Sequence, residues 1–283
     1  MQTLQALRYR QKLTGKAITT TALVLCALLL GTFARADVKN IEGLEFSRVL
    51  LVGSNELELS QGASNALKIR GDNKERSPLP FLLRDDTLVL GVNQKGKNVA
   101  DLQYKVTVAG LEALLVEGSG EAYVKPLAVD DLLVSLEGSG DIRMFDVQAL
   151  DLELRVLGSG ALQAVGCKAR DARLNMKGSG DVQLGSLEAD VIKTHMAGSG
   201  DISVEDGGST DLLEVRLMGS GDVGMAKVQA TAAKVTIMGS GDVDIGVTKQ
   251  LDVEILGSGD LFFRGSPEMS SSVLGSGEIS RAD

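Results

Sequence analysis

Hydrophobic and polar residues alternate along most of this chain, and the alternation is tied to a repeated tripeptide, Gly-Ser-Gly. The position two residues before each tripeptide is always apolar, from Val116 to Val273, and the position three before is polar in all but one case. After the tripeptide the alternation resumes in the opposite phase. Alternation with a period of two on both sides of a glycine-containing corner predicts a strand, a turn and a second strand.

The tripeptides recur at nearly constant spacing. Their first glycines are Gly118, Gly138, Gly158, Gly178, Gly198, Gly219, Gly239, Gly257 and Gly275, at intervals of 20, 20, 20, 20, 21, 20, 18 and 18 residues. These intervals leave no room for a helix of useful length, and a fixed period in this range indicates a repeat architecture. We therefore predict an all-β fold, a single-stranded parallel β-helix solenoid with 18–21 residues per coil.

The glycines of the repeat have a geometric explanation. Where similar corners stack about 4.8 Å apart, little space remains for a side chain and φ can be positive, and glycine satisfies both conditions. Serine is small and polar enough to lie on such an edge. The nine glycines that begin the tripeptides are therefore predicted to be structural turns.

Three segments divide the chain. Residues 1–36 combine a basic front, an apolar run and the small residues Ala34 and Ala36, which together predict a secretory signal peptide. Residues 37–110 lack the tripeptide but contain extended patterns, and we expect irregular N-terminal coils or a cap of the same solenoid. Residues 111–283 form the regular repeat. The protein is therefore expected to be exported, to the periplasm or to the cell surface and extracellular space.

The net charge limits the classes of binding partner, and the cysteine count limits disulfide bonding. The chain has 29 basic and 38 acidic residues, and residues 1–36 carry five of the basic ones and none of the acidic ones, which leaves a net charge of −14 on residues 37–283. Nucleic acids and anionic membrane surfaces attract basic patches. We expect no nucleic-acid partner and no integral membrane segment after leader cleavage. Cys167 is the only cysteine beyond the leader, so no intramolecular disulfide can form there.

An acidic residue follows eight of the nine tripeptides, with Ala161 as the exception. Five aspartates on consecutive coils are predicted to form a row along one edge: Asp181, Asp201, Asp222, Asp242 and Asp260. Unit charges about 4.8 Å apart repel by about 0.9 kcal/mol in bulk water, so another interaction must offset the repulsion. Either each aspartate accepts hydrogen bonds from nearby backbone N–H groups, or the row associates weakly with Ca²⁺. We expect no other cofactor.

Catalytic chemistry has little support in the sequence, and no catalytic residue is assigned. His195 is the only histidine and belongs to the polar, outward column three residues before the tripeptide. Polysaccharide-cleaving β-helices normally interrupt their coils with long loops that build a cleft, whereas these intervals barely vary. The seven aromatic residues of the segment 37–283 are scattered, and we expect no stacking platform for a sugar.

Three stretches carry a resemblance to a known family. They are VLLVGSNELELSQG, then DTLVLGV, then YKVTVAGLEALLVEGSGE leading into repeated GSGD corners. In this order, from about Phe46 to Gly277, the chain resembles the bacterial family of putative auto-transporter adhesins with a head GIN domain. The resemblance implies an exported, right-handed β-helix whose family name suggests adhesion, and it brings no catalytic residues.

Together these observations predict an exported, non-catalytic, adhesin-like module that binds an unidentified envelope or surface ligand. Two alternatives remain open. One is a polysaccharide-acting hydrolase or lyase that uses edge carboxylates. The other is a structural rod that self-associates through its C-terminal coil, because the last segment, GSGEISRAD, leaves an unpaired strand edge.

Overall fold

Strands make up nearly all of the regular structure in the computed structural model, which describes residues 39–71 and 79–282. These ranges contain no helix, and so none long and apolar enough to cross a membrane. The strands belong to one compact unit, Ala36–Asp283, and join into a single 21-stranded sheet. The predicted all-β fold is confirmed. The predicted signal peptide lies outside the described residues.

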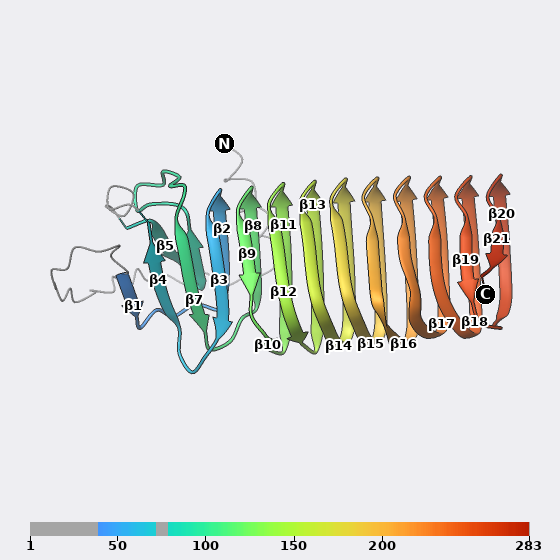
Figure 1. Cartoon of the computed structure of the whole chain (residues 1–283), viewed down its shortest axis with the longest axis horizontal. Helices are drawn as coiled ribbons and strands as arrows, with labels where there is room; N and C mark the ends of the chain where they lie inside the picture. Colours follow the sequence, from blue (N-terminus) through green and yellow to red (C-terminus); the bar gives the residue numbers. More distant parts are fainter. Residues whose placement is uncertain (1–38, 72–78, 283) are drawn as a thin grey trace, which may run out of the picture. The chain divides into compact units, whose positions relative to one another are not determined.

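From Ala113 onward, parallel strands stack coil upon coil (Figure 1). These strands are β8 (Ala113–Gly118), β9 (Glu121–Val124), β10 (Leu127–Ala128), β11 (Asp131–Gly138), β12 (Asp141–Gln148), β13 (Asp151–Gly158), β14 (Ala161–Gly178), β15 (Asp181–Gly198), β16 (Ile202–Gly219), β17 (Val223–Gly239), β18 (Val243–Gly257), β19 (Leu261–Arg264), β20 (Glu268–Gly275) and β21 (Ile279–Arg281). Each coil pairs in parallel with its neighbours, which confirms the predicted parallel β-solenoid.

The glycine corners hold the coils in register. The first glycine of each tripeptide pairs with that of the next coil, from Gly118 with Gly138 to Gly257 with Gly275. Differences in coil length are absorbed away from the corner, at register shifts such as the one between Met225 and Gln229 in β17. The corner therefore stays aligned while the rest of each coil accommodates an extra or a missing residue.

Inward-facing aliphatic side chains form a continuous core. The column two residues before the corner is at most 1% exposed in eight consecutive coils: Val116, Leu136, Val156, Met176, Met196, Leu217, Ile237 and Ile255. Burying one such side chain contributes about 1.5–3 kcal/mol. Since every coil adds several of these residues, the stacked columns supply the main stabilisation of the solenoid.

The segment before Gly110 is arranged in space in a different order from the sequence. Its strands are β1 (Lys39–Glu42), β2 (Arg48–Gly53), β3 (Glu56–Gln61), β4 (Ala66–Arg70), β5 (Phe81–Arg84), β6 (Thr87–Leu90) and β7 (Gln103–Val108). β2 and β3 pair in parallel with β8 and β9 on one side and with β6 and β7 on the other. The coil formed by β2 and β3 therefore lies between two coils that follow it in the chain.

Within the described ranges, antiparallel pairing occurs only in the segment before Gly110, which also contains an isolated antiparallel bridge between Val92 and Asn98. β4 is antiparallel to both β1 and β7, and β5 is antiparallel to β6. Two buried polar side chains hold the segment together. Asn55 hydrogen-bonds the backbone of Val52, Val99 and Leu102, and the Tyr104 hydroxyl donates to the carbonyl of Pro80 and accepts the N–H of Gly91. Burial raises the pKa of Tyr104.

Candidate functional site

The Gly-Ser-Gly corner leaves space for one side chain, that of the serine. The first glycine of every tripeptide has a positive φ, between 114° and 149°. A Cβ on Gly138 would lie 2.2 Å from the carbonyl oxygen of Gly118, and a Cβ on Gly140 would lie 2.1 Å from that of Gly120. Both glycines are therefore required for the backbones of successive corners to approach each other. The serine between them is exposed in all nine coils.

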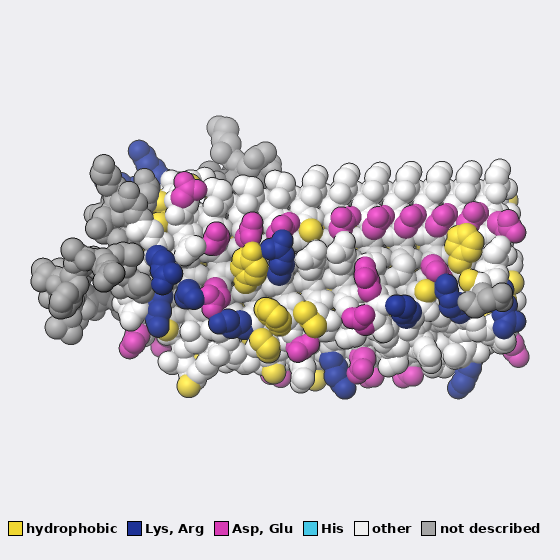
Figure 2. All heavy atoms as spheres, viewed as in Figure 1, with side chains coloured by type: hydrophobic (Ala, Val, Ile, Leu, Met, Phe, Trp, Pro, Cys, Tyr) yellow, Lys and Arg dark blue, Asp and Glu magenta, His cyan; other side chains and the backbone are white. Residues whose placement is uncertain are grey.

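The acidic residues after the corner form a row along the solenoid, coloured magenta in Figure 2. From Asp181 onward, the Oδ1 atom of each aspartate accepts the backbone N–H of the acidic residue in the next coil. The N···O distances are 3.1, 3.0, 2.9, 2.8 and 2.8 Å for the acceptors Asp181, Asp201, Asp222, Asp242 and Asp260 in turn. A donor fixed beside each carboxylate offsets the repulsion within the row.

This bonding pattern begins at Asp201, two coils after Ala161. The N–H groups of Asp141, Ala161 and Asp181 donate to backbone carbonyls, those of Gly120, Gly140 and Gly160. Because Ala161 has no carboxylate, the N–H of Asp181 has no side-chain acceptor in the preceding coil. The N–H groups of Asp141 and Ala161 also donate to backbone carbonyls although Glu121 and Asp141 stand one coil earlier, so a preceding carboxylate does not by itself produce side-chain bonding.

A metal ion would need several ligands at one place. Within residues 39–71 and 79–282, no group of three His, Cys, Asp or Glu side chains lies close enough to hold one. Of the two explanations for the acidic row, backbone hydrogen bonding is the one with contacts in the structure. Calcium association of the row stays a prediction.

The residues with catalytic potential lie apart. His195 is exposed on the outward column between Asn175 and Arg216. Cys167 is buried, and burial raises the pKa of its thiol to about 12, so it stays protonated at neutral pH. Burial also raises the pKa of Glu117, and the neighbouring carboxylate of Glu137 adds to the effect.

Two aromatic residues lie on neighbouring coils of one exposed sheet face. Tyr123 on β9 pairs with Arg143 on β12, and Phe145 follows Arg143 on the same side of that strand. On β14, Val165 lies between Ala164 and Gly166, which pair with Met144 and Asp146 on either side of Phe145. Tyr123, Phe145 and Val165 are 37%, 51% and 56% exposed. Figure 2 shows hydrophobic side chains gathered over these strands, below the acidic row. The expectation of scattered aromatic residues does not hold for this pair.

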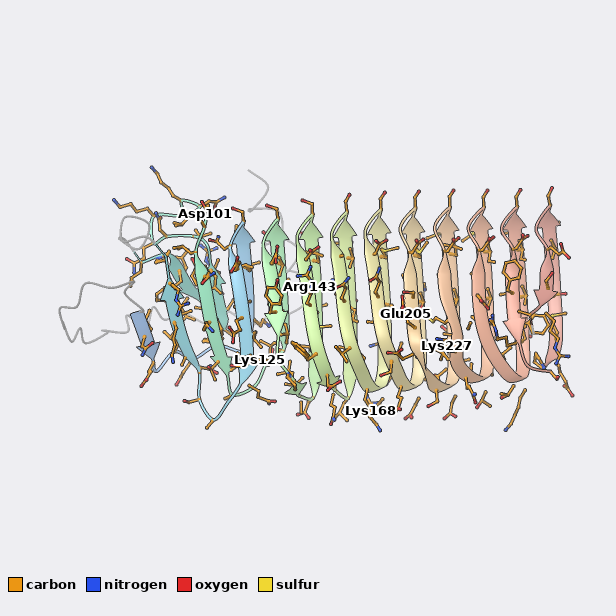
Figure 3. All side chains as sticks on the ribbon, in the orientation of Figure 1. Asp101, Lys125, Arg143, Lys168, Glu205 and Lys227 are labelled. Atoms are coloured by element: carbon orange, nitrogen blue, oxygen red, sulfur yellow. The ribbon has the colours of Figure 1, made fainter. Side chains whose placement is uncertain are left out.

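Hydrogen bonds fix the polar side chains of this face. The Tyr123 hydroxyl donates to Glu121 Oε2 at 2.8 Å and accepts from Arg143 Nη1 at 2.9 Å. Arg143 is labelled in Figure 3. Its guanidinium carbon lies 5.6 Å from the centre of the Tyr123 ring, and its Nη2 reaches Asp141 at 3.4 Å. The hydrogen bond to Glu121 raises the pKa of Tyr123. We call Glu121, Tyr123, Asp141, Arg143, Phe145 and Val165 the aromatic face.

A polar groove of about 430 Å³ crosses β14 to β18 on another part of the surface. Lys168 and Glu188 form an ion pair at 3.2 Å on its wall. The Thr210 hydroxyl, also in the wall, lies 3.0 Å from the carbonyl oxygens of Asp190 and Leu212. The groove contains no aromatic side chain, so it offers hydrogen-bonding groups without a stacking surface.

A family model described as "Putative auto-transporter adhesin, head GIN domain" matches residues 45–206 and 153–267, which together span most of the chain. The chain belongs to this family. The resemblance seen in the three sequence stretches is thereby confirmed. A comparison with curated proteins finds no match.

Solved structures share the fold of this head GIN domain. One from Parabacteroides distasonis, described as a putative lipid binding protein, has a TM-score of 0.63 at 23% identity. A putative adhesin from the same organism has a TM-score of 0.64 at 19% identity, and one from Parabacteroides merdae has 0.62 at 16% identity. Each match covers 87% of this chain and 96% of the other. At these identities the likeness concerns the fold.

For this head GIN domain, sequence reasoning found the corners and the acidic row but missed the aromatic face. The sequence contains the signal that would have revealed this face. Aligning the coils on their tripeptides places Tyr123 directly beside Arg143, because both stand five residues after the first glycine of their coil. The side-chain contacts between them, in contrast, depend on rotamers that the sequence does not specify.

Proposed function

We propose that this head GIN domain is an exported, non-catalytic module that attaches to a ligand of the cell envelope or cell surface. The family description and the adhesin descriptions of two structural relatives support attachment as the function. The signal-peptide pattern of residues 1–36 supports export.

The proposal rests on the regular succession of the coils, which no inserted loop interrupts in the described part of the repeat. From Gly118 to Gly277, a stretch described in full, successive coils stay in register at every corner and no loop is inserted to enclose a cleft. Glycoside hydrolysis needs a substrate held between two carboxyl groups. Attachment needs only an exposed surface with suitable side chains, and the sheet faces of the coils provide this.

Binding to isolated envelope material tests the proposal. Purified labelled protein is titrated onto washed envelope fractions, and the bound fraction is measured after sedimentation. We expect saturable binding, and we expect a variant with asparagine at Asp181, Asp201, Asp222, Asp242 and Asp260 to bind as well as the parent. Absence of saturable binding would overturn the proposal. Loss of binding in the asparagine variant alone would assign attachment to the acidic row.

A polysaccharide-cleaving enzyme is the second candidate, and Glu117 is the observation that favours it. Its pKa is raised by burial and by Glu137, and the general acid of a glycoside hydrolase also has a raised pKa. We expect envelope polysaccharides incubated with the protein to show no new reducing ends. Release of reducing ends that stops in Glu117→Gln would contradict the non-catalytic assignment.

A further inference from the structure

We propose that the aromatic face binds a neutral glycan strand. The inference rests on the proposed function and gives the ligand a chemical class. A pyranose ring presents C–H groups on its flat sides and hydroxyl groups around its rim. A protein surface that recognises it therefore needs an apolar, preferably aromatic, platform with planar polar side chains close by.

The platform is formed by Tyr123 and Phe145, with Val165 extending it to a third coil. Tyr123 is held by Glu121 on one side and by Arg143 from the next coil. A side chain that is already ordered loses little conformational entropy on binding. Phe145 and Val165, each more than half exposed, offer the largest apolar surface of the face.

Planar polar groups continue the same surface along the coils. Gln163 lies beside Arg143 and Gln183 lies beside Gln163, and Gln163 Nε2 donates to Gln183 Oε1 at 3.1 Å. This bond uses one donor and one acceptor of the pair, so the Gln183 amide and the Gln163 carbonyl keep hydrogen-bonding capacity for hydroxyl groups. One coil advances about 4.8 Å, close to one sugar unit of an extended glycan, so successive coils can meet successive sugars.

The charged side chains of the aromatic face favour a neutral ligand over an anionic one. The cation of the face, Arg143, already lies within 3.8 Å of Glu121 and 3.4 Å of Asp141, and these two carboxylates outnumber it. The nearby cations Lys105 and Lys125 both pair with Glu58, so an anionic sugar would have to compete with carboxylates for every cation close to the face. The same carboxylates make the face unsuitable for an acyl chain, which requires continuous apolar surface.

The size of the face also favours a glycan over a protein partner. Its apolar part consists of Tyr123, Phe145 and Val165, whereas a stable protein interface buries about 800 Å² on each partner and involves about 20–30 residues a side. A narrow strand of sugars along three coils matches the extent of the face.

Calorimetric titration of the purified protein with defined oligosaccharides tests this inference. The probes are hexamers of β-1,4-linked glucose, N-acetylglucosamine and xylose, with oligogalacturonate as the anionic comparison. We expect at least one neutral hexamer to bind saturably and oligogalacturonate not to bind. Phe145→Ala and Tyr123→Ala should each weaken the affinity about tenfold or more. Met238→Ala, which removes an exposed apolar side chain outside the face, should leave the affinity unchanged.

Several results would overturn the glycan assignment. One is that no neutral hexamer binds, and another is that the protein binds oligogalacturonate more tightly than the neutral hexamers. The third is that the parent, Phe145→Ala and Tyr123→Ala bind with equal affinity. Phe145 is exposed, so its variant should remain folded even if Tyr123→Ala does not. Periodate oxidation of envelope glycans separates the two proposals. Envelope binding that persists after oxidation would overturn the glycan proposal and leave the attachment proposal intact. Absence of envelope binding before oxidation would overturn the attachment proposal itself.

Discussion

At the scale of the residue, Thr194 is the buried polar member of a mainly aliphatic column, whose other polar member, Ser271 in the last coil, is exposed. It lies between Leu174 and Val215, four residues before the corner, and its side chain is fully buried. Among the described residues its hydroxyl is the buried side-chain polar atom without a hydrogen-bond partner. A buried hydroxyl without a partner destabilises the folded state, because water satisfied it in the unfolded chain.

Thr194→Val should therefore stabilise the protein. The two side chains have similar size, so the change removes the unpaired hydroxyl while the packing is preserved. We expect the free energy of unfolding to rise by about 1 kcal/mol, measured by urea denaturation followed by circular dichroism. Thr236→Val, on the outward column, is the control and should change stability by less than about 0.5 kcal/mol. An unchanged or lower stability of Thr194→Val would show that the hydroxyl has a partner.

At the scale of the element, side chains replace backbone acceptors where strands meet corners. In the acidic row the aspartate Oδ1 accepts an N–H that the carbonyl of a corner glycine accepts in earlier coils. In the first coil Asn55 occupies the third position of the diverged corner Gly53-Ser54-Asn55 and reaches three backbone groups instead. The same corner therefore accepts different residues if each supplies the hydrogen bonds that its neighbours need.

Two substitutions of Asp222 distinguish the effect of charge from the effect of hydrogen bonding within the acidic row. Asp222→Asn keeps an Oδ1 acceptor for the N–H of Asp242 and removes one charge between Asp201 and Asp242, so stability should be unchanged or slightly higher. Asp222→Ala removes the acceptor and should lower the free energy of unfolding by about 0.5–1.5 kcal/mol. Urea denaturation measures both. If asparagine destabilises as much as alanine, the charge itself is needed, and a saturable heat of Ca²⁺ binding by calorimetry would then indicate a bound cation.

Asn55 should tolerate substitution poorly, including the change that completes the tripeptide. Asn55→Ala leaves the carbonyls of Val52 and Val99 and the N–H of Leu102 without their partner in a buried place, which should lower stability by about 2–3 kcal/mol. Asn55→Gly restores Gly-Ser-Gly but loses the same bonds and should be at least as destabilising. Thermal unfolding followed by circular dichroism gives the comparison. A glycine variant as stable as the parent would mean that corner geometry, not bonding, decides this position.

At the scale of the whole molecule, each coil mainly contacts its two neighbours, so the solenoid behaves as a stack of similar units. Gly178 and Gly198 occupy the same place on successive coils, and residues 179–198 form one complete unit between them. The inward columns on either side of this unit are mainly aliphatic, with a difference in size where Ala172 in the preceding coil corresponds to Leu213 in the following one.

Deletion of residues 179–198 should therefore leave a folded, shorter protein. Joining Gly178 to Ser199 preserves the register of the corner and of every inward column. We expect a β-type circular dichroism spectrum, cooperative unfolding and a decrease of about 4.8 Å in the longest dimension by small-angle X-ray scattering. Deletion of residues 179–188 is the control, because half a coil puts the corners out of register. If both deletions behave alike, stacking in register is not what stabilises the fold.

The periodicity allowed the strands, the inward columns and the corners to be predicted, because all three depend on neighbours within a few residues. Alternation decides which side of a strand is buried, and the steric limits of a stacked corner call for glycine. The acidic row followed from the same period. Its bonding to backbone N–H groups was one of two expected possibilities, and the structure added that the donor belongs to the next coil, which depends on distances between coils.

The amino-acid sequence by itself determined a parallel β-solenoid with about 20 residues per coil, since its signals are local and repeat many times. Only the tertiary structure decided that β2 and β3 lie between β6–β7 and β8–β9, and that the Tyr123 hydroxyl contacts Glu121 and Arg143. The physical reason is the same in both cases. Pairing between distant segments depends on which strand edge is free and on how side chains from different coils pack, and neither property is encoded within one period.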